Sequence, residues 1–225
     1  MSRLIELRTA VLAHNDDLAS ALRADLLAAG TVAVNLLSSP GSGKTALLER
    51  LMTTAVGQGL PVAALTGDLA TENDARRLQR SGAPVRQVVT DGLCHLEADL
   101  VRDHLSGWLP SGTRLLLVEN VGNLVCPASY DLGESLRVVL ASVTEGEDKP
   151  VKYPTAYRWA DVVVLTKIDL AEACAFDEQA FLAAVRDVRG DVEVLRTSAR
   201  TGEGVDALLA RLRRTADEVL GGAVP

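Results

Sequence analysis

The residues with the plainest chemical meaning form the segment Ser38-Ser-Pro-Gly-Ser-Gly-Lys-Thr45. An apolar stretch over 31–37 precedes it and a helical pattern over 45–57 follows it, so it predicts a turn between a strand and a helix. Successive backbone N–H groups at such a helix start can surround phosphate oxygens. Gly41 and Gly43 permit the backbone conformations that this arrangement needs. We therefore expect a nucleotide phosphate site here.

Two side chains of this segment have specific tasks in a phosphate loop. Lys44 would place its ammonium on the β and γ phosphates, and the Thr45 hydroxyl would coordinate Mg²⁺. Ser38 stands where the pattern G-x-x-x-x-G-K-S/T has its first glycine. The alternative is an ordinary glycine-rich turn that starts a helix. The predicted nucleotide contacts are Gly41, Ser42, Gly43, Lys44, Thr45 and Ala46.

A second polar segment predicts recognition of guanine. Thr166-Lys-Ile-Asp169 differs by one residue from the pattern N-K-x-D, and Thr197-Ser-Ala-Arg200 follows further along the chain. The Asp169 carboxylate would accept hydrogen bonds from guanine N1 and the exocyclic amine, and losing such paired contacts is costly. Alternatively, Lys167 and Asp169 only cap a turn, because Thr166 replaces the asparagine. The predicted base contacts are Lys167, Asp169, Ser198 and Ala199.

Three side chains could bind a soft or borderline metal ion. Cys94 and His95 are adjacent and Cys126 lies further on, and thiolate and imidazole donors suit Ni²⁺ or Zn²⁺. An odd number of cysteines in a chain without an export signal favours thiols or metal ligands over disulfides. The alternative is that Cys126 is a small buried residue and that the Cys94-His95 pair is incidental. Cys174 has no histidine nearby and is interpreted as a helix-packing residue.

Alternating strand and helix patterns predict the scaffold that positions these residues. Several strand patterns are continuously apolar, as expected for strands that helices cover on both faces. The fold class is therefore α/β, a P-loop NTPase fold with a doubly wound, mostly parallel sheet and helices on both faces. The predicted strands cover 31–37, 61–66, 85–89, 114–119, 136–143, 161–166 and 192–196. The predicted helices cover 3–29, 45–57, 72–81, 95–107, 178–189 and 204–220.

The length of 225 residues suits a single domain of this class. We expect a helical segment over 1–30 that packs on a P-loop GTPase domain over 31–225. The stretch 119–155 is rich in Asn, Gly, Pro, Glu and Asp, and long irregular stretches of this kind usually carry function.

The composition indicates a globular protein without nucleic-acid or membrane partners. The chain is 48% apolar and 24% charged. Its 23 basic and 30 acidic residues give a net charge of -7, which leaves no broad positive field for phosphates or anionic lipids. The segment 1–14 has neither the apolar core of a signal peptide nor a membrane span. We therefore expect a cytoplasmic protein.

Five stretches of the chain resemble the hydrogenase nickel-incorporation GTPases, the HypB family. They are Ser38-Ser-Pro-Gly-Ser-Gly-Lys-Thr45, Gly67-Asp-Leu-Ala-Thr-Glu-Asn-Asp74, Gly92-Leu-Cys-His-Leu96, Glu119-Asn-Val-Gly-Asn-Leu-Val-Cys-Pro-Ala128 and Ser142-Val-Thr-Glu-Gly-Glu-Asp-Lys-Pro-Val-Lys-Tyr-Pro154. The resemblance covers roughly residues 10–215, and the last two stretches are specific to the family. It implies a GTPase of the SIMIBI type that binds nickel or zinc and inserts nickel during hydrogenase maturation.

The resemblance implies further roles at the nucleotide. Asp68 and Glu119 would approach Mg²⁺ and the attacking water beside Thr45, and together with Lys44 they form the implied catalytic group. Lys152 would contact nucleotide near a dimer interface, although a solvated surface lysine is an alternative. The reaction would convert GTP to GDP and phosphate slowly, because no side chain clearly orients the water.

For the metal, the resemblance implies that Cys94, His95 and Cys126 lie at the interface of a GTP-dependent homodimer whose chains pool their ligands. Hydrolysis would then reset the dimer so that nickel passes on. The implied partners are a HypA-like nickel chaperone and the hydrogenase large subunit. The sequence has no His-rich tract and no N-terminal Cys-x-x-Cys-Gly-Cys motif, so we expect it to lack the metal storage of some family members.

Three other functions share part of this pattern. The urease-accessory nickel GTPases have the same phosphate loop but carry Cys-Pro-His where this chain has Cys94-His95. A P-loop kinase or ATPase would use Asp169 only structurally and would prefer ATP. A nucleotide-binding scaffold would hardly turn over its GTP.

Overall fold

The computed structural model of the chain describes residues 2–68, 73–90 and 92–222, and it describes side chains from residue 9 onward except that of Asp68. The strands are β1 (Val32–Ser38), β2 (Val62–Asp68), β3 (Val85–Val89), β4 (Leu115–Glu119), β5 (Leu136–Ser142), β6 (Val162–Thr166) and β7 (Glu193–Arg196). The helices are α1 (Ser2–Ala28), α2 (Lys44–Gly57), α3 (Asn73–Gln79), α4 (Ala98–Leu105), α5 (Lys149–Lys152), α6 (Pro154–Arg158), α7 (Glu178–Arg189) and α8 (Val205–Gly221). Two 3₁₀ turns are η1 (Pro127–Ser129) and η2 (Ile168–Leu170).

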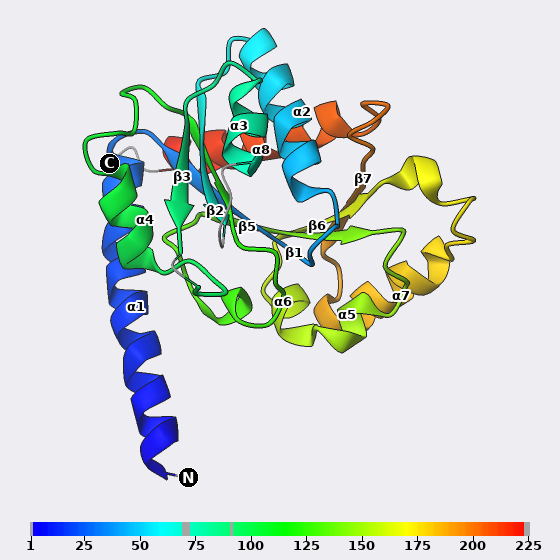
Figure 1. Ribbon diagram of the computed structural model, residues 1–225, viewed down its shortest axis with the longest axis horizontal. Helices are drawn as coiled ribbons and strands as arrows, with labels where there is room; N and C mark the ends of the chain where they lie inside the picture. Colours follow the sequence, from blue (N-terminus) through cyan, green and yellow to red (C-terminus); the bar gives the residue numbers. More distant parts are fainter. Residues whose placement is uncertain (1, 69–72, 91, 223–225) are drawn as a thin grey trace.

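The strands form one sheet in the order β3-β2-β4-β1-β5-β6-β7, and every pairing is parallel. Parallel strands need crossover connections, and helices provide most of them here. The strand β1 lies at the centre between β4 and β5, with its carboxyl end at the predicted phosphate loop. This arrangement confirms the predicted doubly wound parallel sheet (Figure 1).

Helices cover both faces of the sheet. One apolar core joins β1 residues such as Val34 and Leu36 to α2 and α8. On the other face, Ala33 packs toward α1 and α4, while Leu37 packs in a third cluster with α6 and α7. Successive strand residues therefore point into different cores, which is why the strand sequences are continuously apolar.

The structure differs from the predicted elements mainly within 119–155. The short helices α5 and α6 and the turn η1 were not predicted, because each spans only three to five residues and has proline in its first turn. The helix predicted over 95–107 begins at Ala98, so that Cys94 and His95 lie in a loop. In the predicted helix 72–81, residue 72 lies outside the described residues.

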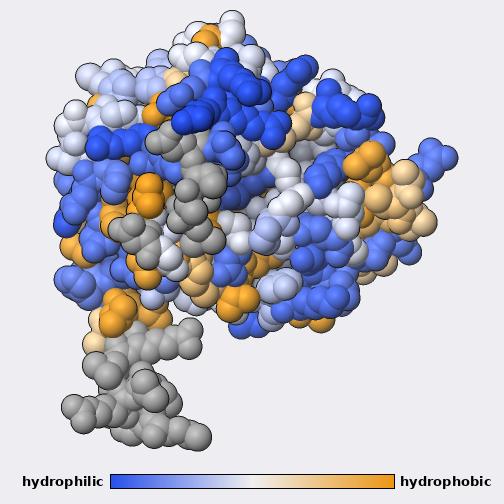
Figure 2. Space-filling model, in the orientation of Figure 1, coloured by the Kyte–Doolittle hydropathy of each residue, from blue (hydrophilic) through white to orange (hydrophobic). Residues whose placement is uncertain are grey.

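The face of the molecule shown in Figure 2 is mostly hydrophilic. On the face shown in Figure 2, apolar side chains appear as scattered patches among polar ones. Within the described part of the chain, no helix combines the length and the apolar character needed to span a bilayer.

The helix α1 is attached to the domain through its second half. Leu22 and Leu26 are buried in the core with α4, whereas residues 9–14 are largely exposed and the ribbon extends beyond the body (Figure 1). Asn15 is buried at 5% exposure, donates to the Asp131 main-chain oxygen at 2.8 Å and accepts from the Ala98 amide at 3.0 Å. The helix thus fixes the start of α4 and the loop that precedes β5.

An ion pair strengthens the same attachment. Arg23 Nη2 lies 2.5 Å from Asp131 Oδ2, and Arg23 Nε donates to the Glu134 main-chain oxygen at 2.9 Å. Burial of Asp131 acts to raise its pKa, but hydrogen bonds from Arg23 and the Gly133 amide outweigh burial, so the pKa lies below its ordinary value. The pair is one-third exposed, so its net contribution is modest.

Replacing Arg23 with Met should lower the free energy of unfolding by about 1 to 2 kcal/mol at pH 7, because the apolar stem remains while the charged hydrogen bonds are lost. A lowered folded-state pKa contributes stability above the ordinary pKa, and this contribution disappears as the pH falls through the folded-state pKa. The difference between wild type and Arg23→Met should therefore shrink below about pH 4. Urea unfolding across a pH series measures this, and a difference that does not change with pH contradicts it.

Candidate nucleotide and metal sites

The phosphate loop connects β1 to α2 and borders a cleft of about 530 Å³. Gly41 and Gly43 have φ angles of 76° and 90°, which side-chain-bearing residues rarely adopt. Ser38, by contrast, is the last residue of β1 and has an extended backbone, so a serine at the position of the first glycine causes no backbone strain in the loop. The six predicted contacts from Gly41 to Ala46 all line this cleft.

The buried carboxylate of Glu119 lies behind the lining of this cleft, in contact with the lining residues Lys44 and Thr45. Glu119 ends β4 at 1% exposure, and it accepts hydrogen bonds from Thr45 Oγ1 at 2.6 Å and Thr66 Oγ1 at 3.0 Å. Lys44 Nζ lies 3.5 Å from Glu119 and donates to the main-chain oxygen of Asn120. Three of the predicted catalytic or Mg²⁺ residues, Lys44, Thr45 and Glu119, are therefore in direct contact.

The remaining predicted nucleotide residues are placed less completely. Asp68 ends β2 beside the cleft-lining Gly67, but its side chain lies outside the described residues. Lys152 is exposed and pairs with Asp148 at 2.6 Å, so within one chain it does not line the cleft. Its neighbour Lys149, which was not predicted, donates to the phosphate-loop side chain of Ser39 at 3.0 Å.

A separate apolar pocket of about 250 Å³ adjoins the phosphate cleft. The Lys167 side chain lines both spaces, and its Cε would lie 3.4 Å from a Cβ at Gly43. Lys167 Nζ donates to the Gly41 main-chain oxygen at 2.6 Å. The pocket lining includes the predicted residues Lys167, Asp169 and Ala199. Its size and position suit a purine base attached to phosphates in the larger cleft.

Both oxygens of the Asp169 carboxylate are already hydrogen-bonded. Ser198 Oγ donates to Oδ1 at 2.5 Å and Arg200 Nε donates to Oδ2 at 2.7 Å. The hydrogen bonds from Ser198 and Arg200 lower the pKa of Asp169, so the group is a carboxylate at neutral pH. A base that donates to Asp169 must therefore share the carboxylate with Ser198 and with the exposed Arg200.

The Thr166 side chain explains how the motif tolerates the loss of asparagine. Its hydroxyl lies 2.6 Å from the main-chain oxygen of Ser42, to which it donates, and 3.1 Å from that of Ala141. Thr166 is buried at the end of β6 and ties the base-binding segment to the phosphate loop.

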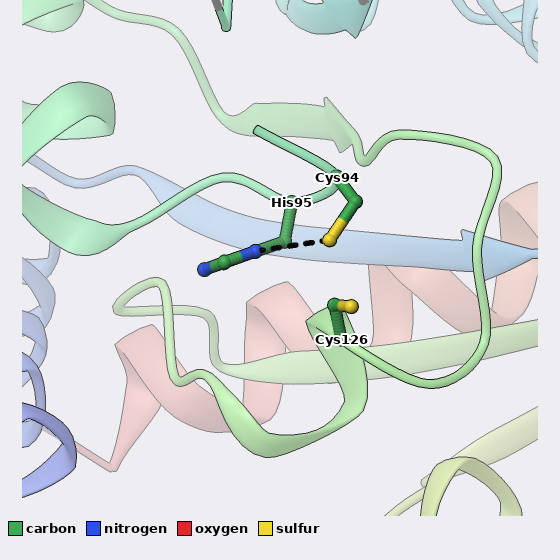
Figure 3. Close-up of side chains that lie close together, drawn as sticks. All are labelled: Cys94, His95 and Cys126. Carbon is green, nitrogen blue, oxygen red and sulfur yellow. Dashed lines mark hydrogen bonds between the residues drawn. The ribbon is translucent and has the colours of Figure 1, made fainter. Parts of the chain in front are cut away.

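The predicted metal residues meet in one cluster. The donor atoms of Cys94, His95 and Cys126 all lie within 4.8 Å of one another, and the Cys94 sulfur is 3.7 Å from His95 Nδ1 (Figure 3). Cys94 and His95 come from the loop before α4, and Cys126 precedes η1. A hydrogen bond with Cys126, and then burial, raise the pKa of the Cys94 thiol. Metal binding must therefore displace a proton from it.

Two neighbours orient the His95 ring. His95 Nε2 lies 3.1 Å from Glu97 Oε1, and the ring packs on Tyr130 with centroids 4.1 Å apart. A carboxylate on one imidazole nitrogen holds its proton there and leaves the other nitrogen free for metal. The structure thus presents Nδ1 to the two sulfurs. Cys174, in contrast, is exposed in a turn and is not part of the cluster. Its interpretation as a helix-packing residue was wrong, because the helical pattern of the sequence ends in an exposed turn at this point.

Comparison with known proteins identifies the family. Residues 32–196 match the family described as CobW/HypB/UreG, nucleotide-binding domain. The hydrogenase maturation factor HypB of Azotobacter vinelandii is 45% identical over 213 residues, which are 95% of this chain and 70% of that protein. The chain belongs to the HypB family.

Two crystal structures of HypB proteins have the same fold. The hydrogenase maturation factor HypB of Archaeoglobus fulgidus is 38% identical with a TM-score of 0.83, over 91% of this chain and 100% of that one. HypB from Helicobacter pylori, solved in complex with nickel, is 34% identical with a TM-score of 0.85, over 91% and 96% of the two chains. These findings confirm the predicted HypB resemblance and the P-loop NTPase fold class.

The HypB motifs do not by themselves point to several residues of the two sites. Glu97 stands two residues after His95, a spacing that could have suggested its supporting role. Lys149 could have been weighed with Lys152, since both lie in the same short motif. Arg77 lines the phosphate cleft and pairs with Glu49 at 2.5 Å, and no sequence signal distinguished it.

Replacing Cys94 with Ser should weaken Ni²⁺ or Zn²⁺ binding by more than about 100-fold, because a serine hydroxyl is a hard donor that stays protonated. The measurement is calorimetric titration of the reduced protein together with the thiolate-to-nickel absorption band. Cys174→Ser is the matched control and should bind metal like wild type. Undiminished binding by Cys94→Ser would show that the metal site lies elsewhere.

Proposed function

We propose that this protein is a GTP-hydrolysing metallochaperone that binds nickel, or zinc, and inserts nickel during maturation of nickel-iron hydrogenases. The observation that carries this proposal is the close approach of the donor atoms of Cys94, His95 and Cys126, beside a phosphate loop in the same chain. Membership of the HypB family and the nickel complex of the Helicobacter pylori protein support it.

The phosphate cleft supplies the groups that GTP chemistry needs. Lys44 would turn its ammonium to the β and γ phosphates, while backbone amides of the loop surround the phosphate oxygens. The Thr45 hydroxyl and Glu119 carboxylate touch each other at 2.6 Å and are the hard oxygen donors that Mg²⁺ prefers. With Asp68 they would hold this ion, which neutralises charge on the transferred phosphoryl group.

Guanine recognition falls to the pocket around Asp169. The carboxylate would accept from guanine N1 and the exocyclic amine with its remaining lone pairs, and Ser198 would keep the carboxylate in place. The Lys167 stem would lie along the base, and the Ala199 amide would face its carbonyl oxygen. Adenine cannot supply the two donors, so the buried contacts favour GTP over ATP.

Hydrolysis should be slow, because the buried Glu119 carboxylate beside the phosphate loop is not free to act as a general base. Glu119 is held by two hydroxyls and faces the Lys44 ammonium. Arg77, the arginine that lines the cleft, is paired with Glu49. Slow turnover suits a protein in which GTP sets the timing of metal transfer.

The metal cluster supports a homodimer. Three donors from one chain leave a nickel or zinc site short of the usual four ligands. Leu93 and Val125, each next to a cysteine of the cluster, are exposed at 44% and 64%. A second copy of the chain would cover these side chains and supply further thiolates. Lys152 would then contact nucleotide near the dimer interface. A HypA-like chaperone and the hydrogenase large subunit would exchange nickel with the dimer.

The test is titration of the reduced protein with Ni²⁺ in the presence of Mg²⁺ and either GDP or a non-hydrolysable GTP analogue, while light scattering follows the molar mass. We expect the Ni²⁺ affinity to differ between the two nucleotides by about 5- to 150-fold, the usual range of allosteric coupling. The GTP analogue should also double the molar mass. An ATP analogue is the control and should have no effect.

Two results would contradict the proposal. Nickel affinity and molar mass that do not depend on nucleotide would leave a nucleotide-binding protein without a metal-delivery role. An equal response to the ATP and GTP analogues would instead favour a P-loop ATPase, in which Asp169 is only structural.

A further inference from the structure

The buried side chain of Asn120 lies between the phosphate cleft and the metal cluster. It follows Glu119 at the end of β4 and has no exposed surface. Its main-chain N–H donates to the Leu36 oxygen of β1 at 3.2 Å, and its Nδ2 lies 3.4 Å from Asn35 Oδ1. The residue is therefore fixed to the central strand, with its other polar groups directed at the two sites.

The contact of Asn120 with the phosphate site is its carbonyl group. Lys44 Nζ donates to the Asn120 main-chain oxygen and faces Glu119 at 3.5 Å. When Lys44 binds nucleotide phosphates, its three N–H groups must be shared among the phosphate oxygens, the Asn120 main-chain oxygen and the Glu119 carboxylate. Nucleotide binding thus changes the interactions of the main chain at Glu119 and Asn120.

The contact of Asn120 with the metal cluster is its side chain. Asn120 Oδ1 accepts from the Leu96 amide at 3.2 Å and from the Val121 amide at 3.0 Å. Leu96 directly follows His95 and is fully buried. Its side chain packs on Gly67 so closely that a Cβ there would lie 2.9 Å from it. The segment that carries Cys94 and His95 is therefore held against two strand ends of the phosphate cleft.

The loop that carries Cys126 also lies along the phosphate loop. Asn123 forms an isolated antiparallel bridge with Ser38, and a Cβ on Gly122 would lie 3.3 Å from Pro40. Both parts of the metal cluster thus touch the nucleotide site. The Cys94-His95 part is held by the buried side chain of Asn120, which is not part of the phosphate loop.

We propose that Asn120 is the positioning residue that couples the two sites: its carbonyl responds to Lys44 and its amide oxygen sets the position of Leu96, and hence of Cys94 and His95. This inference depends on the proposed function, since coupling requires both ligands. A ligand shifts a conformational equilibrium only through different contacts in the two states, and Asn120 contacts both sites directly.

The test compares the ratio of Ni²⁺ affinities with GDP and with a GTP analogue in wild type and in Asn120→Ala. Alanine keeps the main-chain carbonyl for Lys44 and removes the acceptor for the Leu96 amide. We expect the ratio to fall to within about twofold of 1 while Ni²⁺ still binds, so that coupling is lost and not the metal site. The ratio is taken within each variant, so a general change in affinity cancels.

Asn15→Ala is the matched control. Asn15 is also a buried asparagine that accepts from a main-chain amide, that of Ala98, two residues beyond Leu96. It contacts the same segment from α1 and not from the nucleotide site. A merely structural effect would lower the ratio in both variants, whereas our inference predicts the wild-type ratio in Asn15→Ala.

Each outcome has one meaning. A wild-type ratio of 1 contradicts the proposed function itself. Two outcomes overturn the role of Asn120 when the Ni²⁺ affinity of the wild type depends on nucleotide. In the first, Asn120→Ala keeps the wild-type ratio of Ni²⁺ affinities. In the second, Asn15→Ala loses the nucleotide dependence as fully as Asn120→Ala does. If Asn120→Ala does not fold, as checked by circular dichroism, Asn120→Ser replaces it, because its hydroxyl is one bond shorter and does not reach the Leu96 amide.

Discussion

The structure depends on the burial of one carboxylate, that of Glu119. A charge with 1% exposure is tolerated only when hydrogen bonds and an opposite charge compensate for its lost hydration. Thr45, Thr66 and Lys44 provide this compensation from α2 and β2. The end of β4 is therefore held against both elements. Removing any one partner would leave a buried group unsatisfied, so the arrangement has little freedom to vary.

This constraint determines where the two sites can lie. In a parallel sheet, the strand carboxyl ends meet at one edge, and ligands bind there. The phosphate loop leaves β1, the Cys126 loop leaves β4 and the base-binding segment leaves β6 at this edge. The Cys94-His95 segment follows β3 and reaches the same edge through Leu96. The cysteine-histidine cluster and the phosphate loop are thus neighbours because of topology, and Asn120 forms hydrogen bonds beside both of them.

Much of this could be predicted from the sequence because the signals are local. The apolar runs predicted the strands, and Gly41 and Gly43 marked the two positions of the loop that need positive φ angles. The meeting of Cys94 with Cys126 could be expected only through the family resemblance, since spacing does not bring two loops together.

The residues that were missed act over long separations. Thr66 contacts Glu119 across 53 positions and Lys149 contacts Ser39 across 110, so no short pattern reveals them. The hydroxyl of Thr166 was interpreted as a departure from N-K-x-D, yet it binds the Ser42 main chain in a way that only the folded chain shows. The short helices α5 and α6 were missed for a related reason, because packing against α7 and not helix propensity stabilises them.

Nucleotide binding and metal binding should each change the affinity for the other ligand, because residues of the two sites share contacts. Because coupling is reciprocal, its most direct measurement is the preference of the protein for a GTP analogue over GDP, determined with and without bound Ni²⁺. Bound Ni²⁺ should change this preference by the same factor by which the nucleotides change the Ni²⁺ affinity. A GTP-analogue preference that is identical with and without Ni²⁺ would contradict it.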